Sequence, residues 1–181
     1  MDELMFKESL NTNKIGELSA KKIDQLSDDL NKFLDEIKTD DFEKRIEISG
    51  YPEEIKKNIS NKEQLDIYEN VNLVPSEINE MPCLKRTDID LEQVDSFGQS
   101  NLERMQKGLC PILSNGEKVE LHHIGGKSDS PLAELSQSEH RGKGNHGILH
   151  PGNSTIPSEI SRNTFNTEKA NYWKERANEY L

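Results

Sequence analysis

The stretch VELHHIGGKSDSPLAELSQSEHRGKGNHGILHP, residues 119–151, decides the fold of this chain. Its start belongs to a run, Glu117–Ile124, that is typical of a β-strand and ends at the glycine pair 125–126. Leu132–Leu135 forms a second short extended segment. The sequence SQSE at Ser136–Glu139 fits a capping box, which predicts that a helix starts there. We therefore expect two extended segments followed by a helix.

All five histidines of the chain fall inside this stretch: His122, His123, His140, His146 and His150. Three imidazoles on one divalent ion leave positions open for water and a phosphate oxygen, which hydrolysis requires. A further imidazole, with an ordinary pKa of about 6.5, suits a general base. His122 and His123 point to opposite faces unless the strand ends or bends, and the glycines that follow favour a bend. The cluster predicts a metal site, either structural or catalytic.

The segment before this stretch adds a helix and a turn. Ser100–Lys107 is expected to be helical and to stop at Gly108, since glycine tolerates the left-handed conformation of a helix end. Asn115-Gly116 is a strong hairpin signal. It predicts that Pro111–Leu113 pairs with the strand Glu117–Ile124.

The C-terminal segment, Ser158–Leu181, predicts a helix or a helix pair, with Trp173 in the core. Arg141–Asn145 is rich in glycine, so a helix there should be short or interrupted. Cys83 and Cys110 are the only cysteines, and they form no CxxC pair, which excludes a cysteine-ligated zinc site. The sequence leaves open whether they are two thiols or one disulfide.

The first part of the chain differs in character. Residues 13–38 show an apolar stripe at helical spacing that should pack against a partner surface: Ile23, Leu26, Leu30, Phe33 and Ile37. Pro52 starts a short second helix, and residues 69–81 read as a connector. The net charge of −11 divides into −9 for residues 1–80 and −2 for residues 81–181. We expect an acidic helical adaptor or linker region over 1–80 and a chemically active domain over 81–181.

Composition limits the classes of protein. The hydrophobic set makes up 31% of residues, so the core is small. No apolar run approaches the roughly 18 residues that span a bilayer, and the acidic start MDELMFKESL is not typical of a signal peptide, which excludes a membrane protein. Overall acidity argues against a nucleic-acid binder that works by bulk charge, although a local basic site remains compatible with it.

Residues 81–181 closely resemble the LHH group of the HNH/endonuclease VII superfamily of nucleases, which occur as C-terminal toxin domains of bacterial polymorphic toxins. The resemblance rests on ordered motifs: LKRTDID (84–90), FGQSNLERMQKGL (97–109), VELHHIGGKSDSPLAEL (119–135), SEHRGKGN (138–145), ILHP (148–151) and EISRNTFNTEKANYWKERA (159–177). It implies a small ββα-metal domain. Together with the helical pattern of the N-terminal region and of the C-terminal segment, this predicts an α+β fold.

The resemblance also implies roles. His122, His140 and His150 would bind one divalent ion, and His123 would take a proton from the attacking water. His146 competes with His150, although Gly147 and Pro151 argue against a helix that would join the two. Imidazole suits Zn or Ni, and catalysis suits Mg or Mn.

Other positions depart from the family pattern or extend it. Pro131 stands where related enzymes have an asparagine that holds the catalytic loop, so Asp129 or the backbone would have to replace it. Arg86 and Asp88 look structural. The phosphate-binding candidates are Arg104, Lys127, Arg141, Lys143, Arg162, Lys169, Lys174 and Arg176. Of these we favour Arg141 and Lys143, followed by Lys127 and Arg104.

The sequence as a whole predicts a metal-dependent endonuclease that cuts DNA with little sequence preference. The resemblance implies an antibacterial toxin, delivered from the producing bacterium into the cytoplasm of a target cell and accompanied by a cognate immunity protein. An RNA-cleaving toxin and a zinc-stabilised binding module without catalysis are the alternatives.

Overall fold

The structure is a computed structural model that describes residues 21–23, 25–31, 42–142, 144–151 and 162–181. The chain divides into two compact units, Met1–Arg45 and Ile46–Leu181. In the first unit, residues 21–23, 25–31 and 42–45 are helical. Among the described part of the apolar stripe, Ile23, Leu26 and Leu30 are 64%, 68% and 57% exposed. Phe33 and Ile37 lie outside the described residues, as do the two ends of the helix predicted over 13–38.

The second unit carries the following elements in chain order: α2 (Glu53–Lys56), α3 (Lys62–Asn70), β1 (Val74–Ile78), β2 (Met81–Lys85), α4 (Asn101–Gln106), β3 (Val119–His123), β4 (Leu132–Ser136), α5 (Gln137–Arg141), α6 (Asn145–Leu149) and α7 (Arg162–Asn178). The predicted α+β class is confirmed. Among the described residues, no helix is long and apolar enough to cross a membrane.

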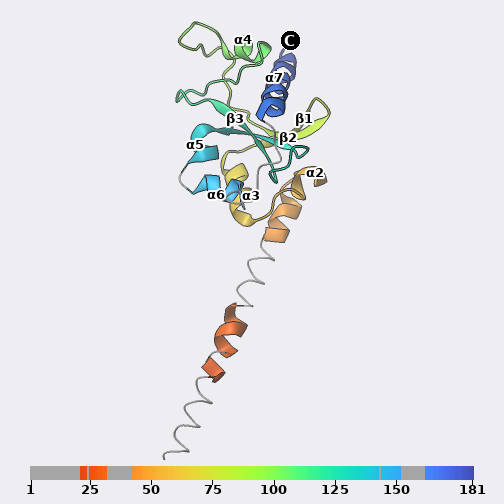
Figure 1. The fold of residues 1–181 in the computed structure, drawn as a ribbon, viewed down its shortest axis with the longest axis vertical. Helices are drawn as coiled ribbons and strands as arrows, with labels where there is room; N and C mark the ends of the chain where they lie inside the picture. The colour runs from red at the N-terminus through yellow and green to blue at the C-terminus, as the bar shows by residue number, and fades with distance from the viewer. Residues whose placement is uncertain (1–20, 24, 32–41, 143, 152–161) are drawn as a thin grey trace, which may run out of the picture. The chain divides into compact units, whose positions relative to one another are not determined.

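The four strands form one mixed sheet in the order β1-β2-β4-β3. The outer pairs, β1–β2 and β3–β4, are antiparallel, and β2 runs parallel to β4 in the middle. Helix α7 covers one face of the sheet together with α4, whereas α5, α6 and α3 lie on the other side (Figure 1). In this strand order, β3 lies at an edge of the sheet.

The pleat of β3 sorts its side chains between these two faces. Leu121 joins the core under α7, where Trp173 and Tyr172 pack, and Trp173 is only 2% exposed. The prediction that Trp173 belongs to the core is confirmed. Glu120 and His122 occupy alternate positions and so face the side of α5 and α6.

Serine capping boxes start two helices, α4 and α5. The Ser136 hydroxyl accepts from the backbone N–H of Glu139, and the Glu139 carboxylate accepts from the Ser136 N–H, which confirms the predicted helix start. Helix α5 stops at Gly142, where a Cβ would collide with the carbonyl oxygen of Ser138. The predicted short helix is therefore confirmed, and the position that ends it accepts only glycine.

The predicted stop of the preceding helix is also confirmed. Helix α4 ends before Gly108, whose φ is +76°. A Cβ at Gly108 would lie 2.9 Å from the carbonyl oxygen of Ala170, so α7 can pack this closely only against glycine.

Residues 69–81 were expected to be a connector, and this was wrong. The segment contains β1, which pairs with β2 through a two-residue turn at Asn79 and Glu80, both at positive φ. Asparagine tolerates this conformation, so the turn closes without glycine. Pro75 fits because β1 is an edge strand.

The second compact unit begins at Ile46, whereas the predicted nuclease domain begins at residue 81. Ile55 of α2 and Leu65 of α3 are fully buried. The unit therefore includes α2, α3 and β1 in addition to the elements of the predicted domain.

The predicted pairing across the turn at Asn115-Gly116 is confirmed, but it is short. Ile112 bridges Lys118, and Val119 donates its N–H to the Pro111 carbonyl at 3.0 Å. The regular partner of β3 is β4, over five residue pairs from Val119↔Ser136 to His123↔Leu132. The extended segment predicted over 132–135 is thus confirmed, and it forms the second strand of the ββα unit.

A buried ion pair ties α7 to the sheet. Arg176 donates from Nε to Oε1 of Glu134 at 3.2 Å, and Tyr172 donates its hydroxyl to the same oxygen at 2.9 Å. The other carboxylate oxygen accepts from the backbone N–H of Arg86 at 2.8 Å. Glu134 is completely buried and Arg176 is 2% exposed, so each charge depends on the other.

We predict that Arg176→Met lowers the free energy of unfolding by about 3–5 kcal/mol, because it leaves the Glu134 carboxylate buried without its cation. Urea denaturation of the full chain measures this. The double variant with Glu134→Gln should lose less than the two single losses added together. Lys174→Met, an exposed position on the same helix, should stay within about 0.5 kcal/mol of wild type. A loss that small for Arg176→Met would contradict the assignment.

Candidate metal centre

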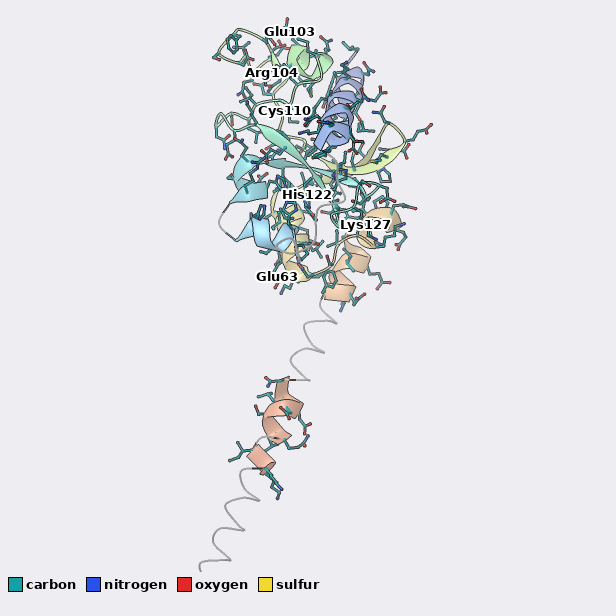
Figure 2. All side chains as sticks on the ribbon, in the orientation of Figure 1. Glu63, Glu103, Arg104, Cys110, His122 and Lys127 are labelled. Atoms are coloured by element: carbon teal, nitrogen blue, oxygen red, sulfur yellow. The ribbon has the colours of Figure 1, made fainter. Side chains whose placement is uncertain are left out.

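Three histidines from three parts of the ββα unit meet at one point. His122 comes from β3, His140 from α5, and His150 is the C-cap residue of α6. Each offers one ring nitrogen, and these atoms all lie within 4.8 Å of one another. The ring centroids are 4.9 to 5.1 Å apart. Figure 2 shows His122 between the sheet and the short helices.

Among the three histidines, the surroundings of His122 most clearly favour a bound ion. Its side chain is 2% exposed, yet neither ring nitrogen has a hydrogen-bond partner among the described residues. Leaving a buried polar group unpaired costs roughly 1–3 kcal/mol. The Nε2 atoms of His140 and His150 face each other at 3.0 Å beside it. This arrangement fits a divalent ion held by three imidazoles, with further coordination positions open.

The ionisation of these rings suits the same use. Burial, together with the neighbouring histidines, lowers the pKa of His122 well below its ordinary value. The same causes lower the pKa of His150 to about 4. Burial also lowers the pKa of His140, although Glu120 opposes the effect. The three rings are therefore neutral near pH 7, which is the form that binds metal ions.

Glu120 orients one of these ligands. Its Oε2 lies 2.7 Å from Nδ1 of His140 and accepts a hydrogen bond from Nε of Arg141 at 2.8 Å. A carboxylate on one ring nitrogen fixes the tautomer and leaves the other nitrogen for the ion. The sequence reasoning missed Glu120. The available signal was its position two residues before His122, on the same face of the strand.

His123 lies on the other face of β3. Its ring packs on Phe165 of α7, with centroids 4.6 Å apart, and its Nε2 is 3.3 Å from a carboxylate oxygen of Glu168. That distance fits an ion pair, but the alignment is not that of a hydrogen bond. Burial lowers the pKa of His123, and Glu168 partly offsets this. Nothing in the sequence singled out Glu168, because it is 45 residues away on α7.

The strand ends at His123, one residue before the predicted end, and Gly126 donates its N–H to the His123 carbonyl at 3.0 Å. The two adjacent histidines nevertheless contact different helices. A substrate that uses both must therefore approach the end or the outer edge of β3, where the two faces meet.

Helix α6 corrects the reasoning about His146. We expected Gly147 and Pro151 to prevent a helix, yet residues 145–149 form one turn whose Leu149 is buried. The ring of His146 is 4.8 Å from that of His150, but His146 is exposed and lies outside the group of three.

The loop between the two strands is held mainly by its backbone. Ile124 donates its N–H to the Pro131 carbonyl at 2.8 Å, and the Ser130 hydroxyl donates to the Lys127 carbonyl at 2.7 Å. Asp129 is exposed and has no hydrogen bond among the described residues. Of the two substitutes considered for the missing asparagine, the backbone is the one observed.

The expected cationic residues differ in position. Arg141 is beside the cluster, with its side chain 65% exposed, and Lys127 is exposed on the loop after β3. Arg104 pairs with Asp95 and donates to the Cys110 carbonyl, well apart from His122 (Figure 2).

The other residues considered can be placed briefly. Arg176 belongs to the buried pair with Glu134 and is not available to a phosphate. Lys143 and the side chain of Arg162 lie outside what the structure describes. Arg86 and Asp88, which were expected to be structural, form an ion pair at 2.6 Å. Both cysteines are free.

Comparison with known proteins agrees with this geometry. Residues 100–179 match the family model described as a nuclease of the HNH/ENDO VII superfamily with conserved LHH. The matched segment contains β3 and β4, all three clustered histidines and the whole of α7. No solved structure was found to match the chain.

We predict that Zn²⁺ or Ni²⁺ binds the purified, metal-stripped chain with one ion per chain and raises its melting temperature. His140→Ala should abolish this binding, and Glu120→Gln should weaken it by about 10- to 100-fold. Isothermal titration calorimetry gives both values. His146→Ala is the matched control and should bind as wild type does. Equal losses for His146→Ala and His140→Ala would contradict the assigned ligand set.

Proposed function

Since residues 100–179 form an LHH nuclease domain of the HNH/ENDO VII superfamily, we propose that this chain is a metal-dependent endonuclease that hydrolyses DNA with little sequence preference. The observation that best supports this is the histidine cluster. Buried His122 lies beside His140 and His150, and neither of its ring nitrogens has a hydrogen-bond partner among the described residues. The metal is one divalent ion, for which Zn, Ni, Mg and Mn are the candidates.

The proposed catalytic roles fall to residues on the two faces of β3. His122, His140 and His150 would hold the ion, and Glu120 would keep His140 in position. When bound, the ion supplies electrostatic stabilisation of the phosphate and of the leaving oxygen.

On the opposite face, His123 accepts the proton of the attacking water. Glu168 faces Nε2 of His123, so a proton kept on that nitrogen leaves Nδ1 as the base. Glu168 is in this proposal a positioning residue. The ring of Phe165 shields the imidazole from bulk water.

The biological setting is also part of the proposal. The motifs resemble toxin domains of bacterial polymorphic toxins, and the acidic region Met1–Arg45 forms a unit separate from the nuclease. We propose that this region is an adaptor or linker left from a delivery protein. The nuclease would then act in the cytoplasm of a target bacterium, and a cognate immunity protein would protect the producer.

Two alternatives remain for the test to separate. A ββα-metal site contacts backbone phosphates, so RNA is the second substrate class. A zinc-stabilised binding module would have the same ligands and no activity. The pairing of His123 with Glu168 favours catalysis, because a structural site has no use for a second oriented imidazole.

We predict that the full chain nicks supercoiled plasmid DNA in the presence of a divalent ion and is inactive in EDTA. His123→Ala should retain metal binding and lower the cleavage rate by about 10²- to 10⁴-fold, the usual contribution of a general base. Gel assays over Mg²⁺, Mn²⁺, Zn²⁺ and Ni²⁺, with total RNA in parallel, measure this. His146→Ala serves as the control.

Each outcome is decisive. Unchanged cleavage by His123→Ala would reject His123 as the base. Cleavage of RNA alone would replace the DNA substrate. Failure to cut either nucleic acid with any of the four ions would reject the nuclease and favour the binding module.

A further inference from the structure

A groove of about 210 Å³ runs along the outer edge of β3, next to the histidine cluster. Its lining includes Glu120 and His140 on the metal side and Phe165 on the side of α7. Val119 bonds to the Pro111 carbonyl, but from Glu120 to the end of the strand no described residue pairs with this edge. An open strand edge lets groups from both faces of the sheet reach one ligand.

Three cations line the groove: Lys118, Arg141 and Lys169. Arg141 is held by Glu120, whereas Lys118 and Lys169 have no carboxylate partner among the described residues. Lys169 Nζ instead lies 4.8 Å from the centre of the Phe165 ring. In a chain with a net charge of −11, unpaired cations gathered at one groove point to an anionic ligand.

The position of Phe165 connects this groove with the chemistry. The ring lines the groove and also packs on His123, while His140 lines the opposite side and belongs to the metal cluster. A chain of phosphates lying along β3 would therefore pass between the candidate base and the candidate ligands. Because His122 and His123 lie on opposite faces of β3, a substrate that uses both has to approach along this edge.

We propose that this groove binds the phosphodiester backbone of the substrate strand beside the scissile bond, with Lys118 and Lys169 as phosphate contacts. The proposal rests on the nuclease function proposed above. Phe165 offers a flat apolar surface on which a neighbouring base can stack. The contacts are to the backbone, so they position the strand without reading its sequence.

The test is the salt dependence of binding by the full chain in EDTA, measured by fluorescence anisotropy with a 20-nucleotide DNA duplex. Each lost phosphate contact should lower the slope of log K against log salt by about 0.9, which is roughly an eightfold loss of affinity at 0.1 M salt. We expect this decrease in slope for Lys118→Gln and for Lys169→Gln, and the sum of the two decreases for the double variant. Lys169→Arg should keep the wild-type slope.

Lys174→Gln is the matched control, since Lys174 is exposed on the same helix but does not line the groove. A second readout uses Cys110, a free, partly exposed thiol in the groove, whereas Cys83 is fully buried. Bound DNA should slow the alkylation of Cys110 by iodoacetamide severalfold. Mass spectrometry reports the modified site.

The outcomes separate this proposal from the one on which it rests. If wild type neither binds nor cuts DNA or RNA, the nuclease function fails. If wild type cuts DNA while both glutamine variants keep its slope and Cys110 stays equally reactive, the groove is not the binding site. Stronger binding of a matched RNA, lost in the same variants, would keep the groove and change the substrate.

Discussion

The alternation of side chains along β3 is the constraint on which the site depends. Within five residues, Val119–His123, one face contributes Leu121 to the core under α7, and the other contributes His122 to the metal cluster. A shift of one residue in the pairing with β4 would exchange these faces and bury Glu120 under α7. The register is held by the apolar residues, so the folding of the core and the placing of the histidines are the same event.

The elements after β3 turn this strand into a site. Strand β4 leads directly into α5 through the capping box at Ser136, which sets where His140 stands relative to His122. The pair of Glu134 and Arg176 fixes α7 on the opposite face, and α7 brings Phe165 and Glu168 to His123. The histidine cluster on one side of the sheet and His123 on the other are therefore assembled around one strand.

Local signals predicted the elements around the site, whereas an irregular hairpin and a contact between distant residues were missed. The strand at His122, the segment 132–135 and the cap at Ser136 could be predicted because each depends on neighbours within a few residues. The β1–β2 pair was missed because Pro75 and the turn at Asn79 look irregular until an edge position accommodates them. Glu168 could not be found, since only the packing of α7 brings it to His123.

Histidine roles came from family resemblance, and the structure adds physical reasons for them. His122, His140 and His150 were grouped by motif, and their nitrogens meet in space. Glu120 explains why His140 can present Nε2 to an ion, which no motif stated. The acidic total charge was misleading, because it describes the whole chain and not the edge of β3, where Lys118, Arg141 and Lys169 gather.

The most direct test of this account is a crystal structure of the metal-loaded chain, with anomalous diffraction recorded at the absorption edge of the bound ion. The account predicts one strong anomalous peak within bonding distance of ring nitrogens of His122, His140 and His150. A peak that is ligated through His123 or His146, or no peak near His122, would contradict it.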